Sequence, residues 1–469
     1  MKRAKKLYIL LGVLVAACVI TFAATRIEQR REDIKNSDEI ILQIPIDSVQ
    51  SLSWDYEDSF SFHKNEAWLY DADEEFPVDA DAIDKLLSVF EEFGASFVIE
   101  NVEDYGQYGL DDPICTIEVG ANEQVVQIQL GNFSNMDSQR YVSVGDGNVY
   151  LVSYDPLDEY GAVLSDLIDH DEIPYFSDIT SISFEGNGEN YEILYEEESK
   201  NTYCSDDVYF AQINGKSLPL DTSSVQSYTS GIRSLGLTNY VNYKVTEAEL
   251  ANYGLDSPEL TVTIYYDHDV DGETASDSFV IHLSRNREEV AEAEETTKED
   301  DASDEYVTAY ARIGDSRIIY ELTSTQYNSL IAMAYNDLRH RDVMTVDFEK
   351  VYQMDIALEG SKYTLTSEEN EDEDSRTWFY QDEELSITDL KLAIEDATVA
   401  EFSTEAPTGK EEISLTLLLN DDNFAEATVA FYRYDGTNCL AVIDGTPLAL
   451  VARSYVVDLI EAVNAIVLN

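Results

Sequence analysis

The stretch PVDADAIDKLLSVFEEFG, residues 77–94, has a counterpart in PLDTSSVQSYTSGIRSLG, residues 219–236. Each copy begins with an aspartate suited to a helix N-cap and ends in a glycine suited to the C′ position, 142 residues apart at both ends: Asp79 and Gly94, Asp221 and Gly236. Between these ends, apolar residues recur at helical spacing: Ile83, Leu86, Leu87, Phe90; Val225, Tyr228, Ile232, Leu235. The sequence therefore predicts one amphipathic helix that is used twice in an internal repeat.

Three further pairs of segments support the repeat. Alternating apolar and polar residues before each helix predict a half-buried strand, at Val49–Trp54 and Ile179–Phe184. After the helices, YGLDDP at 108–113 is answered by YGLDSP at 253–258. Each copy closes with a predicted hairpin, around Gly145-Asp146 and Gly314-Asp315.

A third copy is degenerate. It begins near Val351–Ile356, continues through a possible helix at Thr388–Ala400 and ends with Asp444-Gly445 between two apolar runs, without the YGLD turn. We expect an α+β fold, with an N-terminal transmembrane helix followed by tandem repeated units of antiparallel sheet with one amphipathic helix each. The expected domains are an anchor (1–30), a first unit (40–172), a second unit (173–345) with an acidic insertion (288–305), and a third unit (346–469).

The N-terminus predicts a membrane anchor. Four cations, Lys2, Arg3, Lys5 and Lys6, precede an apolar run from Leu7 to Ala24, which can just span a bilayer as a helix. Acidic residues accompany the later arginines, so the positive-inside tendency favours a cytoplasmic N-terminus and an extracytoplasmic bulk. Two alternatives remain: a lipoprotein anchored through Cys18, which apolar residues follow where a processed lipoprotein turns polar, and a cleaved signal peptide.

The charge balance limits the possible partners. The 469 residues include 95 acidic and 29 basic side chains, a net charge of −66, which disfavours nucleic acid and anionic lipid. Solubility through self-repulsion explains most of this charge. We expect solvated loops or disordered insertions at two acidic runs, Glu288–Glu305 and Glu368–Asp374.

The sequence assigns no catalytic, cofactor-binding or metal-binding residue, and we expect no enzyme and no cofactor. The histidines stand far apart and without metal-ligand spacing: His63, His170, His268, His282 and His340. Cys115, Cys204 and Cys439 are scattered, so no disulfide framework is predicted.

Two motifs have a structural and a functional interpretation. Asp267, Asp269 and Asp271 with Gly272 resemble the start of a calcium loop, but position twelve is Ser278 and the flanks are predicted strands, which favours an acidic hairpin turn. The YGLD turns are better explained as structural turns than as sites, because Gly permits positive φ and Pro ends local helix. Core or rim positions are expected for the tryptophans: Trp54, Trp68 and Trp378.

The anchor, the strand pattern, the Pro-Val-Asp helix start, the 108–113 turn and the Gly145-Asp146 hairpin together resemble the bacterial domain of unknown function 4340 family. The resemblance covers about residues 40–345 and fades over the third copy. It implies a membrane-anchored, extracytoplasmic protein encoded beside ABC-transporter components of the gliding-motility or auxiliary type, and it implies no catalytic residue.

We therefore expect an extracytoplasmic accessory protein whose partners are the membrane, through its N-terminal helix, and ABC-transporter permease or ATPase subunits. The alternative is a cell-surface binding module for a cell-wall polymer or a cation, supported by the charge and by 31 tyrosines. A third hypothesis is an enzyme of unfamiliar type. The sequence does not indicate the oligomeric state.

Overall fold

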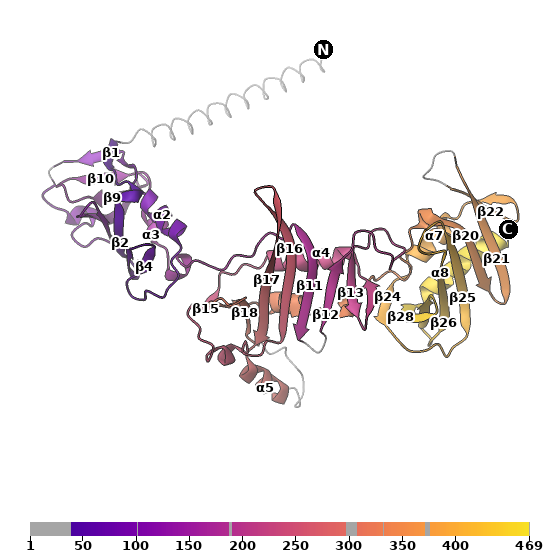
Figure 1. Ribbon diagram of the computed structural model, residues 1–469. Coiled ribbons are helices and arrows are strands. Elements are labelled where there is room, and N and C mark those ends of the chain that lie inside the picture. Colours follow the sequence, from indigo (N-terminus) through magenta and orange to yellow (C-terminus); the bar gives the residue numbers. More distant parts are fainter. Residues whose placement is uncertain are drawn as a thin grey trace, which may run out of the picture. The chain divides into compact units, whose positions relative to one another are not determined.

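The computed structural model describes residues 39–100, 102–186, 190–296, 307–331, 333–370 and 376–468 (Figure 1). The predicted membrane anchor, Leu7–Ala24, and Cys18 lie outside these residues. Within the described part, no helix combines the length and the apolar character needed to cross a membrane. The chain forms two compact units, one of residues up to Asp171 with Leu237–Val245, the other of Glu172–Gly236 with Thr246–Asn469.

The first large sheet has eight strands in the order β4-β3-β2-β7-β8-β9-β10-β6, paired antiparallel. Its strands are β2 (Val49–Asp55), β3 (Ser59–Lys64), β4 (Trp68–Tyr70), β6 (Phe97–Ile99), β7 (Cys115–Ala121), β8 (Gln124–Ser134), β9 (Gln139–Ser143) and β10 (Val149–Val152). Its helices are α2 (Ala80–Ser88) and α3 (Leu157–Tyr160). A separate pair joins β1 (Glu39–Leu42) to β5 (Phe93–Ala95).

The second sheet has the order β14-β13-β12-β11-β16-β17-β18-β19-β15. Its strands are β11 (Asp178–Gly186), β12 (Tyr191–Tyr195), β13 (Tyr209–Ile213), β14 (Lys216–Pro219), β15 (Tyr240–Asn242), β16 (Leu260–Val270), β17 (Glu273–Arg285), β18 (Ala309–Ile313) and β19 (Ile319–Leu322). The helices of this part are α4 (Thr222–Arg233), α5 (Arg287–Thr296) and α6 (Ser324–Ile331).

The third sheet has the order β23-β22-β21-β20-β25-β26-β27-β28-β24. Its strands are β20 (Val351–Leu358), β21 (Ser361–Glu369), β22 (Arg376–Tyr380), β23 (Glu383–Leu385), β24 (Val399–Phe402), β25 (Glu411–Leu419), β26 (Glu426–Arg433), β27 (Asn438–Ile443) and β28 (Thr446–Ala452). Its helices are α7 (Thr388–Glu395) and α8 (Arg453–Val467). Short 3-10 turns complete the chain: Ile46–Ser48, Gly106–Tyr108, Leu164–Asp166, Leu250–Tyr253, Tyr335–Asp337 and Phe348–Lys350.

The three sheets repeat one topology. Strand by strand, the second and third orders coincide, and the first differs only in lacking the strand that corresponds to β14 and β23. The first strand of each copy has its irregularity at the same place, before Ser51, Ser181 and Gln353. The fold is thus α+β with mostly antiparallel sheets and an internal repeat, and the third copy forms a complete sheet without the YGLD turn. The predicted domain boundaries stay a prediction.

The repeated helix begins as the sequence predicts and ends earlier. The Asp79 carboxylate accepts hydrogen bonds from the backbone N–H groups of Asp81 (2.9 Å) and Ala82 (3.2 Å), and Asp221 accepts one from Ser223 (3.0 Å). The prediction that Gly94 ends the first helix is wrong, because α2 stops at Ser88 and Gly94 pairs with β1. Gly236 likewise lies beyond the end of α4 at Arg233.

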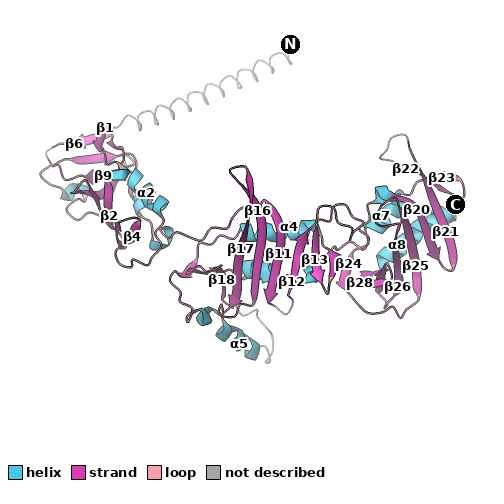
Figure 2. Cartoon of the chain, in the orientation of Figure 1, coloured by secondary structure: helices cyan, strands magenta, loops and turns pink. Residues whose placement is uncertain are grey.

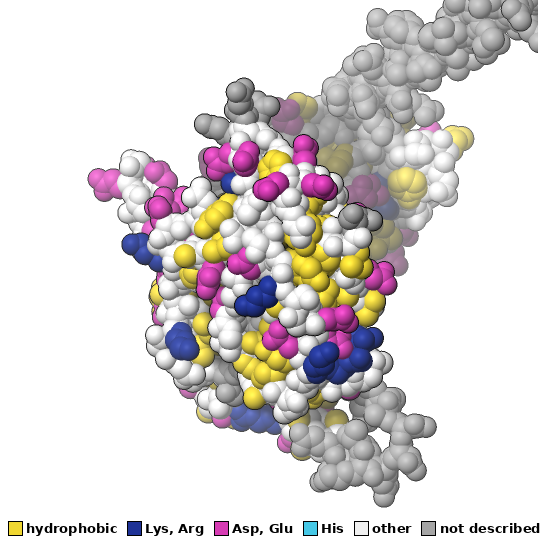
Figure 3. Space-filling model, turned by 90° about the vertical axis from the view of Figure 1, so that its right-hand side faces the viewer, with side chains coloured by type: hydrophobic (Ala, Val, Ile, Leu, Met, Phe, Trp, Pro, Cys, Tyr) yellow, Lys and Arg dark blue, Asp and Glu magenta, His cyan; other side chains and the backbone are white. Residues whose placement is uncertain are grey.

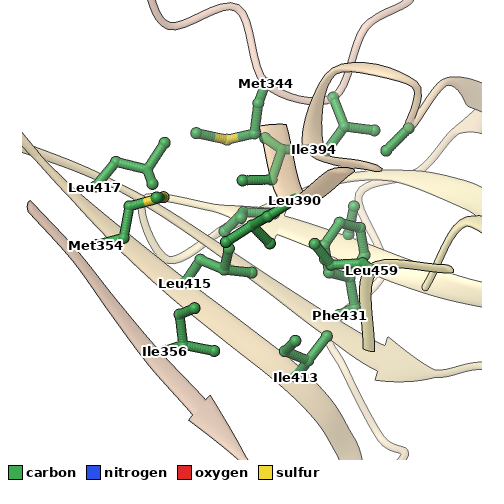
Figure 4. Close-up of a cluster of buried hydrophobic side chains, with 14 of the residues drawn as sticks. Met344, Met354, Ile356, Leu390, Ile394, Ile413, Leu415, Leu417, Phe431 and Leu459 are labelled. Atoms are coloured by element: carbon green, nitrogen blue, oxygen red, sulfur yellow. The ribbon is translucent and has the colours of Figure 1, made fainter. Parts of the chain in front are cut away.

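Each sheet carries a second helix that the sequence reading did not include. α3, α6 and α8 each follow the closing hairpin of their repeat. In the core of the third repeat, α7 and α8 pack together on side chains from β20, β25 and β26 (Figure 4). The residues labelled there include Met354, Ile356, Leu390, Ile394, Leu415, Phe431 and Leu459. Two helices, rather than one, therefore cover the apolar face of each sheet.

The YGLD segments are turns at the start of β7 and β16. Gly109 and Gly254 have φ of 72° and 73°, in the left-handed region that glycine tolerates. The following leucines, Leu110 and Leu255, are buried, and a Cβ on Gly254 would lie 2.4 Å from the Ser284 hydroxyl. The structural interpretation of this motif is confirmed.

The acidic insertion was wrongly expected to be a loop or disordered throughout. Its first part forms α5, whose N-terminus is capped by the Asn286 side chain accepting from the N–H groups of Glu288 (3.0 Å) and Glu289 (3.3 Å). Residues 297–306 lie outside the described part. The second acidic run also departs from a loop, since Glu368 and Glu369 end β21, and residues 371–375 are not described.

Candidate interaction surface

One face of each sheet packs on helices (Figure 2), and the other is open over part of its strands, because all four residues of β10 and the central four of β27 are buried. In the first sheet, Trp54 of β2 contacts the Tyr160 ring of α3, with centroids 5.5 Å apart. In the second, Phe184 of β11 contacts Tyr228 of α4 at 5.7 Å. Since side chains alternate along a strand, the intervening residues, such as Ser53 and Ser183, face away from the helices. Each repeat therefore offers a flat, solvent-facing sheet surface.

Polar side chains line these open faces in rows that run across the strands. In the first sheet, pairing in register aligns one row of four residues, the last of which is buried: Asp55, Thr116, Gln129, Ser143. In the second sheet, the same positions hold another polar row: Glu185, Thr261, His282, Arg312. In the third sheet, they are mostly apolar: Ala357, Ser414, Ala430, Val442. The three faces share a geometry and differ in chemistry, so one ligand would not suit all three.

The second row is connected by hydrogen bonds and charge. The Thr261 hydroxyl and His282 Nδ1 lie 2.9 Å apart. Burial, assisted by the nearby Arg312 guanidinium, holds the pKa of His282 below its ordinary value, which favours a neutral ring. Arg312 also donates from Nε to the Ser316 carbonyl at 2.7 Å. This row is a fixed polar stripe rather than a set of loose surface charges.

A carboxylate and an arginine lie at corresponding positions in the second and third sheets. Glu259 accepts two hydrogen bonds from Arg285, at 2.8 Å from Nη2 and 3.1 Å from Nε, and a third from the Tyr327 hydroxyl. Burial alone would raise the pKa of Glu259, but these donors keep it below its ordinary value. The equivalent pair is Glu412 and Arg433, with Nε and Oε1 2.7 Å apart. Both pairs could have been found from the sequence by aligning the repeats.

Asp207 and His340 form a largely buried titratable pair. The Asp207 side chain is fully buried, its Oδ1 lies 2.7 Å from His340 Nε2, and its Oδ2 accepts from the Thr202 hydroxyl at 2.6 Å. Asp207 ends the loop between β12 and β13, which also carries Tyr203 onto Phe424 of the third repeat at 5.4 Å. The pair thus fixes a loop that joins the second and third repeats. Within the described residues, the hydrogen-bond partner of the imidazole is a carboxylate and not a nucleophilic hydroxyl or thiol.

The three aspartates of the calcium-like motif lie at a hairpin, as predicted. Asp271 and Gly272 form the two-residue turn between β16 and β17, with φ of 57° and 86°. Asp269 accepts from the Gly272 N–H at 3.0 Å and Asp267 accepts from the Ser276 hydroxyl at 2.6 Å. Within the described ranges, no group of three or more His, Cys, Asp or Glu side chains has a geometry that could hold a metal ion.

The structure does not bring the remaining predicted residues together into one site. Among the described cysteines, all three are free thiols, and burial raises the pKa of Cys115 and Cys204 to about 12 and that of Cys439 to about 11. The tryptophans are core residues, as expected, with exposures of 2%, 5% and 6% for Trp54, Trp68 and Trp378. These thiols and indoles therefore add nothing to the open faces.

Comparison with known proteins gave one match. The model of a family described as a domain of unknown function, DUF4340, matches residues 68–205 and 213–412. These two segments together cover more than half of the chain. The first runs from β4 to the loop after β12 and the second from the end of β13 to the start of β25, so each begins in one sheet and continues into the next. No curated protein matches the chain, and no solved structure matches it either.

Proposed function

The chain belongs to the DUF4340 family, and from that membership we propose that it is a non-catalytic, membrane-anchored accessory protein of an ABC-type transport complex, of the gliding-motility or auxiliary type. In this proposal the anchor is a single transmembrane helix at Leu7–Ala24, with the N-terminus in the cytoplasm and the tandem sheets outside it. A lipid anchor through Cys18 is the lesser alternative. The partners are the permease or ATPase subunits.

The observation that carries the proposal is the set of open sheet faces. A flat polar face of four or more strands is suited to a protein partner, which can cover a broad area and pair with its hydroxyl and amide groups. Asp55, Thr116 and Gln129 of the first row, and the counterpart row in the second sheet, supply such groups. A catalytic role would instead favour a deep cleft with converging titratable groups.

The net charge of −66 does not prevent apolar contact with a partner. On the face of the molecule drawn in Figure 3, hydrophobic side chains gather in patches, bordered by both acidic and basic ones. Mixed surfaces of this kind are typical of protein interfaces, where apolar area is surrounded by a polar rim. The surface therefore supports binding to a protein more than binding to a simple cation.

A photo-crosslinking amino acid tests the proposed surface. Inserted at Thr263, on the open face of the second sheet, it is expected to give an adduct with a transporter subunit in cells. Inserted at Gln226, an exposed residue of α4 on the opposite, helix-covered side, it is expected to give little. Mass spectrometry of the adducts measures both. Equal yields from the two positions, or adducts only from Gln226, would count against the open face as the contact surface.

A second candidate function is a cell-surface binding module for a cell-wall polymer. One feature of the second sheet favours it, a hydroxyl-lined hollow beside Tyr265. The hollow lies on the same open face as Thr263, two residues along β16, so a polymer bound there and a transporter subunit would compete for this surface.

A further inference from the structure

We propose that the hollow beside Tyr265, on the open face of the second sheet, binds a neutral or amino-sugar chain. The hollow has a volume of about 610 Å³ and is wide open to solvent. Its lining includes residues from β11, β12, β16 and β17: Thr180, Ser181, Glu192, Tyr265, Asp277 and Ser278. The inference rests on the second candidate function, the binding of a cell-wall polymer, and specifies the class of polymer.

The strand register explains how the hollow is built. Ser181 of β11 pairs with Tyr265 of β16, and Tyr265 pairs with Ser278 of β17, so the three side chains form one row across the sheet. The register shift between Ile179 and Ser181 adds Thr180 at the edge of this row. The Thr180 hydroxyl donates to the Tyr265 carbonyl at 3.2 Å, which fixes this edge.

The lining has the chemistry that sugars need. The Tyr265 side chain is 44% exposed, which leaves a ring face for the C–H groups of a pyranose ring. Serine and threonine hydroxyls can both donate to and accept from sugar hydroxyls, and the Glu192 carboxylate can accept from a neighbouring hydroxyl pair. A shallow site of this kind suits a chain that lies along the sheet, rather than a buried small molecule.

Charge decides between classes of sugar polymer. All lining residues are described, and none of them is Lys, Arg or His, whereas Glu192 and Asp277 are acidic. Together with a net charge of −66, these carboxylates would repel phosphate-bearing or uronic-acid polymers. A neutral chain avoids that repulsion, and the carboxylates attract a protonated amino sugar. The occupant is therefore a neutral or amino-sugar chain.

The site belongs to the second repeat alone. Gly120 in the first sheet and Leu418 in the third occupy the position of Tyr265. They pair with Ser51 and Gln353, as Tyr265 pairs with the equivalent Ser181. Neither can stack on a sugar ring as an aromatic side chain does. The repeat thus provides an internal comparison, in which the same backbone position carries the ring once in three copies.

Titration of the full-length, detergent-solubilised protein with oligomers tests the inference. The probes are N-acetylglucosamine oligomers (neutral), glucosamine oligomers (cationic) and galacturonate oligomers (anionic), with heat of binding as the readout. Saturable binding of the first or second, and none of the third, is expected. Tyr265→Ala is expected to weaken binding about tenfold or more, and Tyr265→Phe to retain it, because stacking needs the ring and not the hydroxyl.

Tyr352→Ala is the matched control, since Tyr352 is a tyrosine of β20 with a similar exposure of 38%. It should bind as the wild type does. Glu192→Lys keeps the test decisive if Tyr265→Ala fails to fold, because a cation in the hollow should shift preference toward the anionic oligomer. No saturable binding of neutral or amino-sugar oligomers, or equal losses for Tyr265→Ala and Tyr352→Ala, would overturn the proposal.

Discussion

Replacement of Asp207 by asparagine is expected to lower the free energy of unfolding of the unit that contains it by about 2–4 kcal/mol. The Asp207 side chain is fully buried and accepts from both His340 Nε2 and the Thr202 hydroxyl. The amide can replace only one of these acceptors well, and the buried imidazole loses its counter-charge. Urea denaturation of the full-length protein, followed by tyrosine and tryptophan fluorescence, measures the loss.

The loss should depend on pH. Burial lowers the pKa of His340, but the hydrogen bond and charge of Asp207, with Asp221 and Asp342, outweigh it and raise the pKa above 6.5. A raised histidine pKa adds stability that is complete below the unfolded value and disappears as the pH rises through the folded value. The difference between wild type and Asp207→Asn is therefore expected to be larger at about pH 5.5 than at about pH 9.

Asp206→Asn is the control for this prediction, because Asp206 is the exposed neighbour in the same loop. It removes the same charge from the chain without touching His340, and a change within about 0.5 kcal/mol is expected. If Asp206→Asn and Asp207→Asn destabilise equally, or if the Asp207→Asn loss grows with pH, the buried pair is not what holds the loop.

The second large effect is expected in the first unit, where Arg140→Met should lower the free energy of unfolding by about 3–5 kcal/mol. The Arg140 side chain is 9% exposed, its Nε lies 2.6 Å from Asp155 Oδ1, and its Nη1 donates to the Gly131 carbonyl at 2.7 Å. Methionine retains the apolar stem and removes the guanidinium donor from the Gly131 carbonyl and from the Asp155 carboxylate, which keeps the Leu157 N–H at 3.1 Å. Denaturation in urea again gives the measurement.

Lys85→Met separates the effect of burial from the loss of an ion pair. Lys85 pairs with Glu159 at 2.6 Å in the same unit, but its side chain is 69% exposed. Exposed pairs contribute about 0–1 kcal/mol, so this variant should differ little from the wild type. A loss for Lys85→Met as large as that for Arg140→Met would mean that the surface network, and not the buried arginine, stabilises the unit.

The parts of the fold that local patterns encode were predictable. The helix starts at Asp79 and Asp221, the repeated YGLD turns and the Asp271-Gly272 hairpin each combine a few neighbouring residues with a specific backbone role. The internal repeat made these patterns easier to recognise, because each motif supported its counterpart 142 or 145 positions later. The helix end at Gly94 was misjudged, since pairing with β1 takes that glycine into a strand.

Pairs formed across the fold were not predictable in the same way. Asp207 and His340 are 133 positions apart, and no periodicity links them. The open-face rows depend on strand register and on a shared irregularity at the start of each sheet, which alternation alone does not specify. Helix α8 was missed because the third copy was expected to close with the strand that ends near Val451. Strand register and long-range packing therefore could not be predicted from the sequence.

The accessory role is tested most directly by affinity capture of the full-length, membrane-extracted protein in gentle detergent, with mass spectrometry of the co-purifying chains. Stoichiometric recovery of permease or ATPase subunits of an ABC-type transporter is expected. Recovery of the protein alone, from cells shown to contain those subunits, would contradict it.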